Sequence, residues 1–219
     1  MMITQITALI ILSLVISSAL IALPNKSESV SVGLFSNMDT SGWKEKSFNG
    51  NTQYQIISEQ GKTSLRAVAD MSASAFYKKI KVDLNTTPYL NWSWRVDKSL
   101  NELNEQTKQG DDYAARIYVI VKLGLAPWNT KALNYVWSSS KGDQTWPNAY
   151  TEKAIMIPMR SRHDSNSQWY MEKVNVMEDF KQYFGIDVDK IDGIAIMTDT
   201  DDSELSAIAQ YGDIFFTVN

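Results

Sequence analysis

The stretch QGDDYAARIYVIVKL, residues 109–123, predicts a β-strand from residue 115 onward, because apolar residues occupy every second position. One face of this strand carries Ala115, Ile117, Val119, Val121 and Leu123. The opposite face carries Arg116, Tyr118 and Lys122, and two carboxylates, Asp111 and Asp112, precede the strand. A strand that alternates in this way packs one face on a core, so the charged and aromatic groups are predicted to point away from that core.

Similar short extended segments follow one another along the chain and are separated by turn residues. They are predicted at residues 30–35, 43–48, 52–58, 63–70, 75–84, 89–96, 115–123, 132–139, 152–159, 167–176, 191–198 and 212–218. This pattern predicts an all-β fold, an antiparallel β-sandwich or jelly roll with one or two short helices. Pro158 lies inside one run, which predicts an edge strand or a bulge there.

Two segments have a helical spacing instead. Residues 175–185 place Met177, Phe180 and Phe184 on one stripe and end at Gly185, which predicts a helix with a glycine C-cap. Residues 203–212 begin at Ser203, a possible N-cap, and end at a glycine, which predicts the second helix. The polar segment 97–110 is predicted to be a long loop at the rim of the fold.

The N-terminus contains the one long apolar run of the sequence, residues 6–23. Small residues at positions 17–19 form a cleavage-site pattern, which predicts a signal peptide over residues 1–24. No Lys or Arg precedes the run, and its length nearly reaches the ~18 residues of a membrane span. An uncleaved N-terminal anchor is therefore the alternative, and any membrane contact is expected through this segment. In both cases residues 25–219 are expected to form a single β-sandwich domain that is periplasmic or secreted.

Composition limits the functions that this chain can have. The net charge is −4 over 219 residues and no basic run occurs, so a nucleic-acid partner is not expected. The chain contains no cysteine, which excludes disulfides, thiolate metal sites and a cysteine nucleophile. His163 is the one histidine, which excludes a zinc site built from several histidines, and no glycine-rich phosphate loop is present.

The chain has seven tryptophans, and such residues bind sugars in many exported β-sandwiches, because the apolar face of a pyranose stacks on an indole ring. Trp137 is predicted to be such a binding residue. Trp92 and Trp94 share a strand face with apolar neighbours, so their side chains are expected in the core. Trp128 and Trp146 lie in loop segments and fit either role.

Carboxylates are concentrated in two segments at predicted strand ends, GDDY at 110–113 and TDTDD at 198–202. Such groups can bind Ca²⁺, act as an acid/base pair on a glycosidic bond, accept a bidentate arginine such as Arg95 or Arg116, or cap turns. The sequence leaves these four alternatives open.

A sheet face that looks away from the core can form a concave recognition surface. We predict that side chains from several strands meet on such a face and bind a glycan or another small polar ligand. The predicted binding residues are Arg95, Asp111, Asp112, Arg116, Tyr118, Trp137, Glu172 and Asp199. The alternative interpretation of the charged members is a network of buried ion pairs that ties the strands together.

Six motifs in this order resemble a bacterial family of exported proteins, domain of unknown function 3047. They are LNWSWRV (90–96), GDDYAARIYVIV (110–121), LNYVWSS (133–139), MEDFKQYFG (177–185), IDGIAIMTDTDDS (191–203) and YGDIFF (211–216). The family architecture looks similar to galactose-binding-like jelly rolls, many of which bind glycans and carry a structural Ca²⁺. The resemblance therefore implies Ca²⁺ as the one cofactor to consider, with Asp213 as its ligand.

The sequence thus predicts an exported carbohydrate-binding protein. A glycoside hydrolase or lyase is the first alternative, and it would draw its carboxylate pair from Asp111, Asp112, Glu172, Asp199 and Asp201. A non-catalytic envelope protein that binds another protein is the second alternative.

Overall fold

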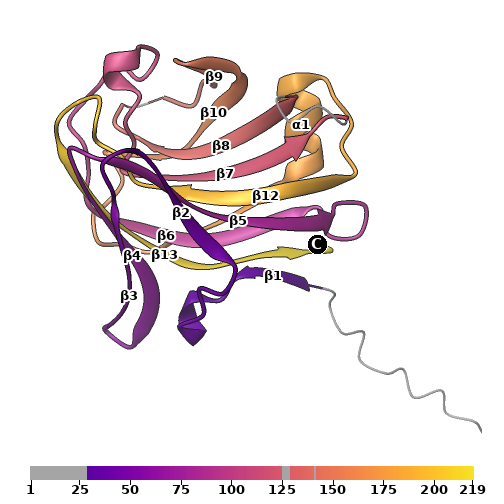
Figure 1. The fold of residues 1–219 in the computed structure, drawn as a ribbon, viewed down its shortest axis with the longest axis horizontal. Coiled ribbons are helices and arrows are strands. Elements are labelled where there is room, and N and C mark those ends of the chain that lie inside the picture. Colours follow the sequence, from indigo (N-terminus) through magenta and orange to yellow (C-terminus); the bar gives the residue numbers. More distant parts are fainter. Residues whose placement is uncertain (1–28, 125–128, 141) are drawn as a thin grey trace, which may run out of the picture.

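Two β-sheets are stacked face to face in the computed structural model, which describes residues 29–124, 129–140 and 142–219 (Figure 1). The predicted signal peptide, residues 1–24, and Trp128 lie outside the described residues. None of the described helices is long and apolar enough to cross a bilayer.

The first sheet has six strands in the order β11-β6-β13-β4-β3, and β1 also pairs with β13. Its strands are β1 (Ser29–Gly33), β3 (Gln53–Glu59), β4 (Lys62–Asp70), β6 (Tyr89–Lys98), β11 (Tyr170–Asn175) and β13 (Ser206–Thr217). The central strand β13 pairs antiparallel with both β4 and β6.

The second sheet has seven strands in the order β2-β5-β12-β7-β8-β10-β9. Its strands are β2 (Trp43–Asn49), β5 (Ala73–Asp83), β7 (Ala115–Lys122), β8 (Thr130–Ser138), β9 (Trp146–Asn148), β10 (Thr151–Ser161) and β12 (Lys190–Met197). The all-β sandwich prediction is confirmed, although β8 and β10 pair in parallel. Pro158 lies at a shift in the register of this pair, which confirms the predicted bulge.

The hydrophobic core fills the space between the two sheets. Ile117 and Val119 of β7 are fully buried in it, and Trp92 and Trp94 of β6 pack edge to face with ring centroids 5.4 Å apart. Side chains alternate along a strand, so the residues between these core positions point to the outer faces of the sandwich. The core position predicted for the two tryptophans is confirmed.

The predicted helix over 175–185 is present as α1 (Val176–Phe184), which lies at one end of the sandwich (Figure 1). The side chain of Asn175 accepts hydrogen bonds from the backbone N–H groups of Met177 and Glu178 and so caps the N-terminus. Gly185 ends the helix with φ +66°, a left-handed conformation that glycine adopts at low cost. Two further short helices have 3₁₀ geometry, η1 (Phe35–Asn37) and η2 (Lys108–Gly110).

The helix predicted over 203–212 is wrong, because most of this segment belongs to strand β13. Ala207, Ala209 and Tyr211 alternate along the strand and are fully buried. Pairing of β13 with β4 and β6 satisfies its backbone groups on both sides, and this pairing outweighs the local helical preference of the alanines. The glycine that was expected to end a helix instead lies at a register shift between β13 and β6.

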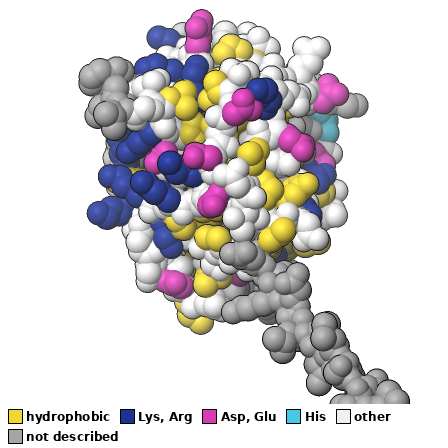
Figure 2. Space-filling model, turned by 90° about the vertical axis from the view of Figure 1, so that its right-hand side faces the viewer, with side chains coloured by type: hydrophobic (Ala, Val, Ile, Leu, Met, Phe, Trp, Pro, Cys, Tyr) yellow, Lys and Arg dark blue, Asp and Glu magenta, His cyan; other side chains and the backbone are white. Residues whose placement is uncertain are grey.

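The predicted long loop is present after β6 and is attached to the end of β8. Glu105 of this loop is buried, and its carboxylate accepts hydrogen bonds from the Ser138 hydroxyl, at 2.6 Å, and from the backbone N–H of Ser139, at 2.5 Å. Figure 2 shows one face of the molecule, on which Lys and Arg side chains gather along one edge with Asp and Glu side chains among them. Charges of both signs are therefore mixed on that face.

Candidate functional site

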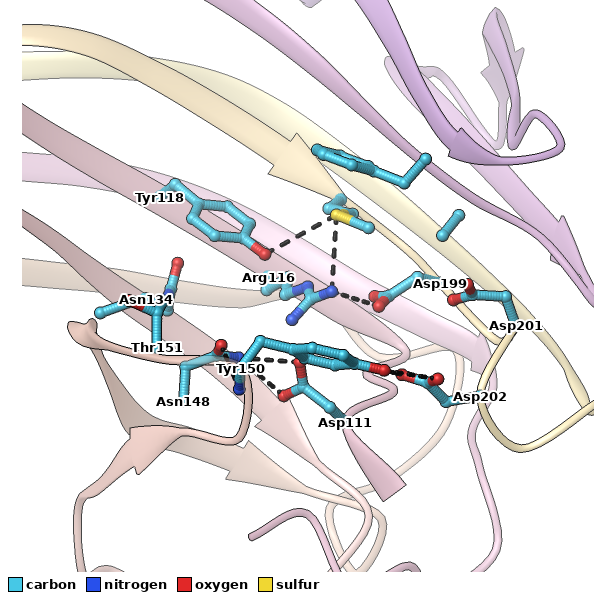
Figure 3. A pocket seen from close by; sticks show the side chains of 14 residues that line it. Asp111, Arg116, Tyr118, Asn134, Asn148, Tyr150, Thr151, Asp199, Asp201 and Asp202 are labelled. Carbon is cyan, nitrogen blue, oxygen red and sulfur yellow. Dashed lines mark hydrogen bonds and ion pairs between the residues drawn. The ribbon is translucent and has the colours of Figure 1, made fainter. Parts of the chain in front are cut away.

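A pocket of about 410 Å³ opens on the outer face of the seven-stranded sheet (Figure 3). Its floor comes from neighbouring strands, with Arg116 and Tyr118 on β7, Asn134 on β8 and Met197 at the end of β12. These positions alternate with core positions, which explains why the polar groups of β7 face outward. Ligand pockets in proteins commonly span ~300–1,000 Å³, so this pocket has the size of a small-molecule site.

Arg116 lies at the centre of the floor and forms a buried ion pair with Asp199, whose carboxylate follows β12 (Figure 3). The rings of Tyr113 and Tyr118 lie 4.9 and 5.3 Å from the guanidinium carbon. Burial, the largest single effect, lowers the pKa of Arg116, but Asp199, Tyr118, Asp111 and Tyr113 together outweigh it and raise the pKa. The guanidinium therefore stays charged, and its Nε and Nη1 atoms have no hydrogen-bond partner among the described residues.

Asp111 forms part of the pocket wall and is held by Asn148. The Asn148 side-chain nitrogen donates to both carboxylate oxygens, at 2.9 and 2.8 Å. Burial raises the pKa of Asp111, and the positive charge of Arg116 opposes this shift. The pocket thus holds a carboxyl group that takes up a proton more readily than an exposed aspartate does.

Two exposed aromatic rings line the pocket, Phe48 from β2 and Tyr150 from the turn between β9 and β10. They are 59% and 54% exposed, and no other aromatic side chain among the described residues is as exposed. The Tyr150 hydroxyl donates to both oxygens of Asp202, at 2.8 and 2.9 Å (Figure 3). This hydrogen bond is the main cause that raises the pKa of Tyr150 to about 12.

The two acidic segments of the sequence meet beside the pocket. Carboxylate oxygens of Asp112, Asp201 and Asp202 lie within 4.8 Å of one another. Asp112 is fully buried and accepts hydrogen bonds from the backbone N–H groups of Asp202, at 3.4 Å, and Ser203, at 2.6 Å. Three carboxylates supply some of the six to eight oxygens that Ca²⁺ takes. Asp112 also connects the segment before β7 to the turn after β12, so it has a structural role of its own.

The structure separates the predicted site residues into groups. Asp111, Arg116, Tyr118 and Asp199 line the pocket, as does Asp201 from the set considered for a hydrolase. The remaining predicted residues, Arg95, Asp112, Trp137 and Glu172, do not line it.

Trp137 is fully buried in the core, because its side chain points to the opposite face of β8 from Asn134. Its ring packs edge to face on Trp94, with centroids 5.9 Å apart, and on Tyr170, with centroids 5.5 Å apart. In this position the indole has no surface to offer to a ligand.

Arg95 and Glu172 belong to the six-stranded sheet and lie in separate ion pairs there. Arg95 pairs with Asp97 at 2.9 Å. Glu172 accepts hydrogen bonds from Arg160, at 2.7 Å, and from the Trp94 indole nitrogen, at 3.1 Å. Because Arg160 lies on β10 and Glu172 on β11, this ion pair joins the seven-stranded sheet to an edge strand of the six-stranded sheet.

Asp213, the predicted Ca²⁺ ligand, lines a second hollow of about 620 Å³ together with Glu172. Its carboxylate accepts two hydrogen bonds from Ser36, from the backbone N–H at 2.8 Å and from the hydroxyl at 2.6 Å. Among the described residues, the group of potential metal ligands does not include Asp213. The structure therefore assigns Asp213 to the attachment of η1 rather than to an acidic cluster.

Sequence reasoning missed several pocket residues, namely Phe48, Asn134, Asn148 and Tyr150, whereas Asp202 belongs to the acidic segment 198–202 that the sequence singles out. For Phe48 and Tyr150 the sequence does contain a signal that could have identified them. Each is an aromatic residue in a strongly polar segment, WKEKSF (43–48) and WPNAYTE (146–152). An aromatic side chain with no apolar neighbour on its own face is a candidate for an exposed binding position.

The fold is similar to that of the family 30 carbohydrate-binding module of a cellulosomal cellulase of Clostridium thermocellum, with a TM-score of 0.53 and 11% identity over 87% of this chain and 97% of that chain. The family 11 carbohydrate-binding module of a second cellulosomal cellulase of the same organism matches with a TM-score of 0.47 and 12% identity, over 85% of this chain and 93% of that chain. No curated protein matches the chain in sequence. At these identities the likeness extends to the fold alone, the β-sandwich. The family described as Protein of unknown function (DUF3047) matches residues 41–215, and the chain belongs to this family.

Proposed function

We propose that this protein binds a carbohydrate in the pocket on the outer face of the seven-stranded sheet. The observation that carries the proposal is the position of the two exposed aromatic rings, Phe48 and Tyr150, at a pocket whose floor carries polar side chains. Sugar rings have an apolar face and a polar edge, and they combine stacking on aromatic rings with hydrogen bonds from their hydroxyl groups.

The floor of the pocket supplies both hydrogen-bond donors and hydrogen-bond acceptors. Arg116 has unpaired donors, and Asn134 and Asp199 each have one unpaired buried acceptor oxygen. A sugar hydroxyl donates one hydrogen bond and accepts others, so it can satisfy both kinds of group. Buried polar groups are costly to leave without partners, and a ligand that pairs them gains affinity from doing so.

The similar carbohydrate-binding module of the clostridial cellulase supports the choice of ligand class, and the apolar N-terminal run supports export. We infer that the mature protein is a single β-sandwich domain that recognises a glycan of the cell envelope or the surroundings. Mass spectrometry of the exported protein tests this inference, since cleavage after Ala19 indicates a signal peptide and an intact N-terminus in the membrane fraction indicates an anchor.

A glycan array with the full-length protein and three variants tests the function. We expect binding to be lost in Phe48→Ala and Tyr150→Ala and kept in Met171→Ala. Met171 is 85% exposed and lines the second hollow, so it is a matched surface control. A blank array with the wild-type protein contradicts carbohydrate binding and favours a protein partner, whereas loss of binding only in Met171→Ala moves the site to the second hollow.

Glycoside cleavage is a second candidate, because burial raises the pKa of Asp111 in the pocket and a general acid needs such a shift. Asp201 lines the same pocket and is a second carboxylate for this chemistry. Release of reducing ends from a bound oligosaccharide, abolished in Asp111→Asn, is the result expected of a hydrolase. Binding without any release of reducing ends supports the binding function alone.

A further inference from the structure

The charged side chains of the pocket are mostly acidic. Asp111, Asp199, Asp201 and Asp202 line it, whereas Arg116 is its one lining cation among the described residues. The charge of Arg116 is already balanced by Asp199 in the buried ion pair. The other carboxylates leave an excess of negative charge for a ligand to meet.

Among the described residues, side-chain oxygens that lack a hydrogen-bond donor lie both in the buried floor of this pocket and at its half-buried rim. Asn134 is 1% exposed and Asp199 is 1% exposed, and each has one side-chain oxygen without a hydrogen-bond partner among the described residues. Asp201 lies at the half-buried rim, and its carboxylate makes no hydrogen bond or ion pair with another described residue. Unpaired acceptors of this kind call for a ligand that is rich in donors.

An aromatic ring lies beside the rim carboxylates. Tyr150 contacts Asp202 through its hydroxyl group, and the ammonium group of Lys108 lies 5.2 Å from the centroid of its ring. Ammonium groups are attracted both to carboxylates and to aromatic faces, and the two attractions add where water is partly excluded. The rim is thus suited to a cation attached to an organic ring.

We propose that the glycan recognised in this pocket carries a free, protonated amine, as in an amino sugar that is not N-acetylated. The ammonium group lies against Asp201, and the sugar ring stacks on Tyr150. This inference rests on the proposed carbohydrate-binding function and names the class of sugar. Uronic acids and sulfated sugars are disfavoured, because their negative charge meets Asp111, Asp201 and Asp202.

Calorimetric titration of the full-length protein with two oligosaccharides of equal length tests the proposal, one of glucosamine and one of N-acetylglucosamine. The titrations are run at pH 6 and low salt, because an amine near the α-amino range of about 7.7–8.0 is protonated there and screening is weak. We expect the free-amine oligosaccharide to bind about tenfold more tightly, a difference of about 1.4 kcal/mol.

Three variants test whether Asp201 causes the preference for the free-amine oligosaccharide. Asp201→Asn removes the charge, and the preference for the free-amine oligosaccharide should fall below about threefold. Asp201→Glu retains the carboxylate and should retain the preference. Asp187→Asn is the control, because the Asp187 side chain is 84% exposed and pairs with Lys181 on α1, outside the pocket.

Each result has a distinct consequence. Equal affinity for the two oligosaccharides, or a preference that persists in Asp201→Asn, overturns the amine proposal and leaves carbohydrate binding intact. Binding that requires calcium and disappears with a chelator also overturns it, because the carboxylates then hold a metal ion. A protein that binds neither oligosaccharide and gives a blank glycan array contradicts the proposed function itself.

Discussion

Arg116 and Asp199 form an ion pair whose side chains are 4% and 2% exposed, and both residues line a pocket that opens away from the hydrophobic core. The pair comes from adjacent strands, since Arg116 lies on β7 and Asp199 directly follows β12. A buried charge is costly unless it is paired, so this contact fixes the geometry of the pocket floor.

The first prediction concerns this ion pair. Arg116→Ala leaves the Asp199 carboxylate buried without its partner, and we expect the free energy of unfolding to fall by about 3–5 kcal/mol. The control is Arg162→Ala, which removes a pair with Glu102 whose side chains are 32% and 68% exposed and should cost at most about 1 kcal/mol. Urea unfolding measures both values, and equal losses would show that the Arg116 pair contributes no more than a surface pair.

The second prediction concerns Trp137. Because this indole is fully buried in the core, Trp137→Ala should lower the free energy of unfolding by about 3–5 kcal/mol through loss of packing and a new cavity. Phe48→Ala, which truncates a 59% exposed ring, should change stability by about 0.5 kcal/mol or less. Chemical unfolding of both variants compares them. A stable Trp137→Ala variant that has lost glycan binding would place this residue in a binding site after all.

The third prediction separates the ring of Tyr150 from its hydroxyl group. Tyr150→Phe keeps the stacking surface and loses the hydrogen bond to Asp202, so glycan affinity should stay within about threefold of the wild type. Tyr150→Ala removes the ring and should weaken binding by about tenfold or more. Calorimetric titration gives both affinities. Equal losses in the two variants would indicate that the hydroxyl group, and not the ring, recognises the sugar.

The fourth prediction concerns Gly110, which directly precedes the carboxylates of the 110–113 segment. A Cβ at this position would lie 2.4 Å from the backbone oxygen of Asn104, so Gly110→Ala forces the loop to shift. We expect a loss of about 1–3 kcal/mol in unfolding free energy. At Gly142 nothing lies within 4 Å of such a Cβ, and Gly142→Ala should change stability by about 0.5 kcal/mol or less. Thermal unfolding of the two variants compares them.

The fifth prediction concerns the dependence of stability on pH. Burial raises the pKa values of Glu105, Asp111, Asp112 and Asp179 above the unfolded values of 4.5 for Glu and 3.8 for Asp. As pH falls toward those unfolded values, the folded state takes up protons before the unfolded state does, so acidification stabilises the fold in this window. We expect a higher melting temperature at pH 5 than at pH 7.5.

Asp111→Asn tests the origin of this pH effect, because it removes one of these four carboxyl groups with a raised pKa. The increase in melting temperature between pH 7.5 and pH 5 should be smaller in this variant than in the wild type. A wild-type melting temperature that falls steadily over the same range would mean that paired carboxylates, and not buried ones, dominate acid stability.

Strand alternation predicted much of the fold, and it also predicted which face of β7 looks outward. The apolar positions of that strand do lie in the core, and Arg116 and Tyr118 do line an outer pocket. The helix prediction for residues 203–212 is wrong because local propensity favours a helix there, whereas β4 and β6 supply hydrogen-bonding partners on both sides of a strand. Such partners come from residues far away in the chain and leave no local signal.

The sequence identifies the strands better than it identifies which polar and aromatic side chains share one surface. Alternation identified the outer face of β7, but in β8 both faces carry apolar or aromatic residues, Tyr135 and Trp137 on one and Val136 on the other, so it does not identify the core face there. Trp137 was therefore assigned to a binding surface although it lies in the core, and Arg95 and Glu172 were grouped with residues of the opposite sheet. Tyr150 was missed because its position depends on the turn between β9 and β10.

The sequence by itself determined that this chain builds an all-β sandwich without disulfides, because residue counts and alternation are local properties of the chain. Tertiary structure alone decided that Asp111, Arg116 and Asp199 meet beside Phe48 and Tyr150, because sheet order and the stacking of two sheets depend on pairings between distant strands.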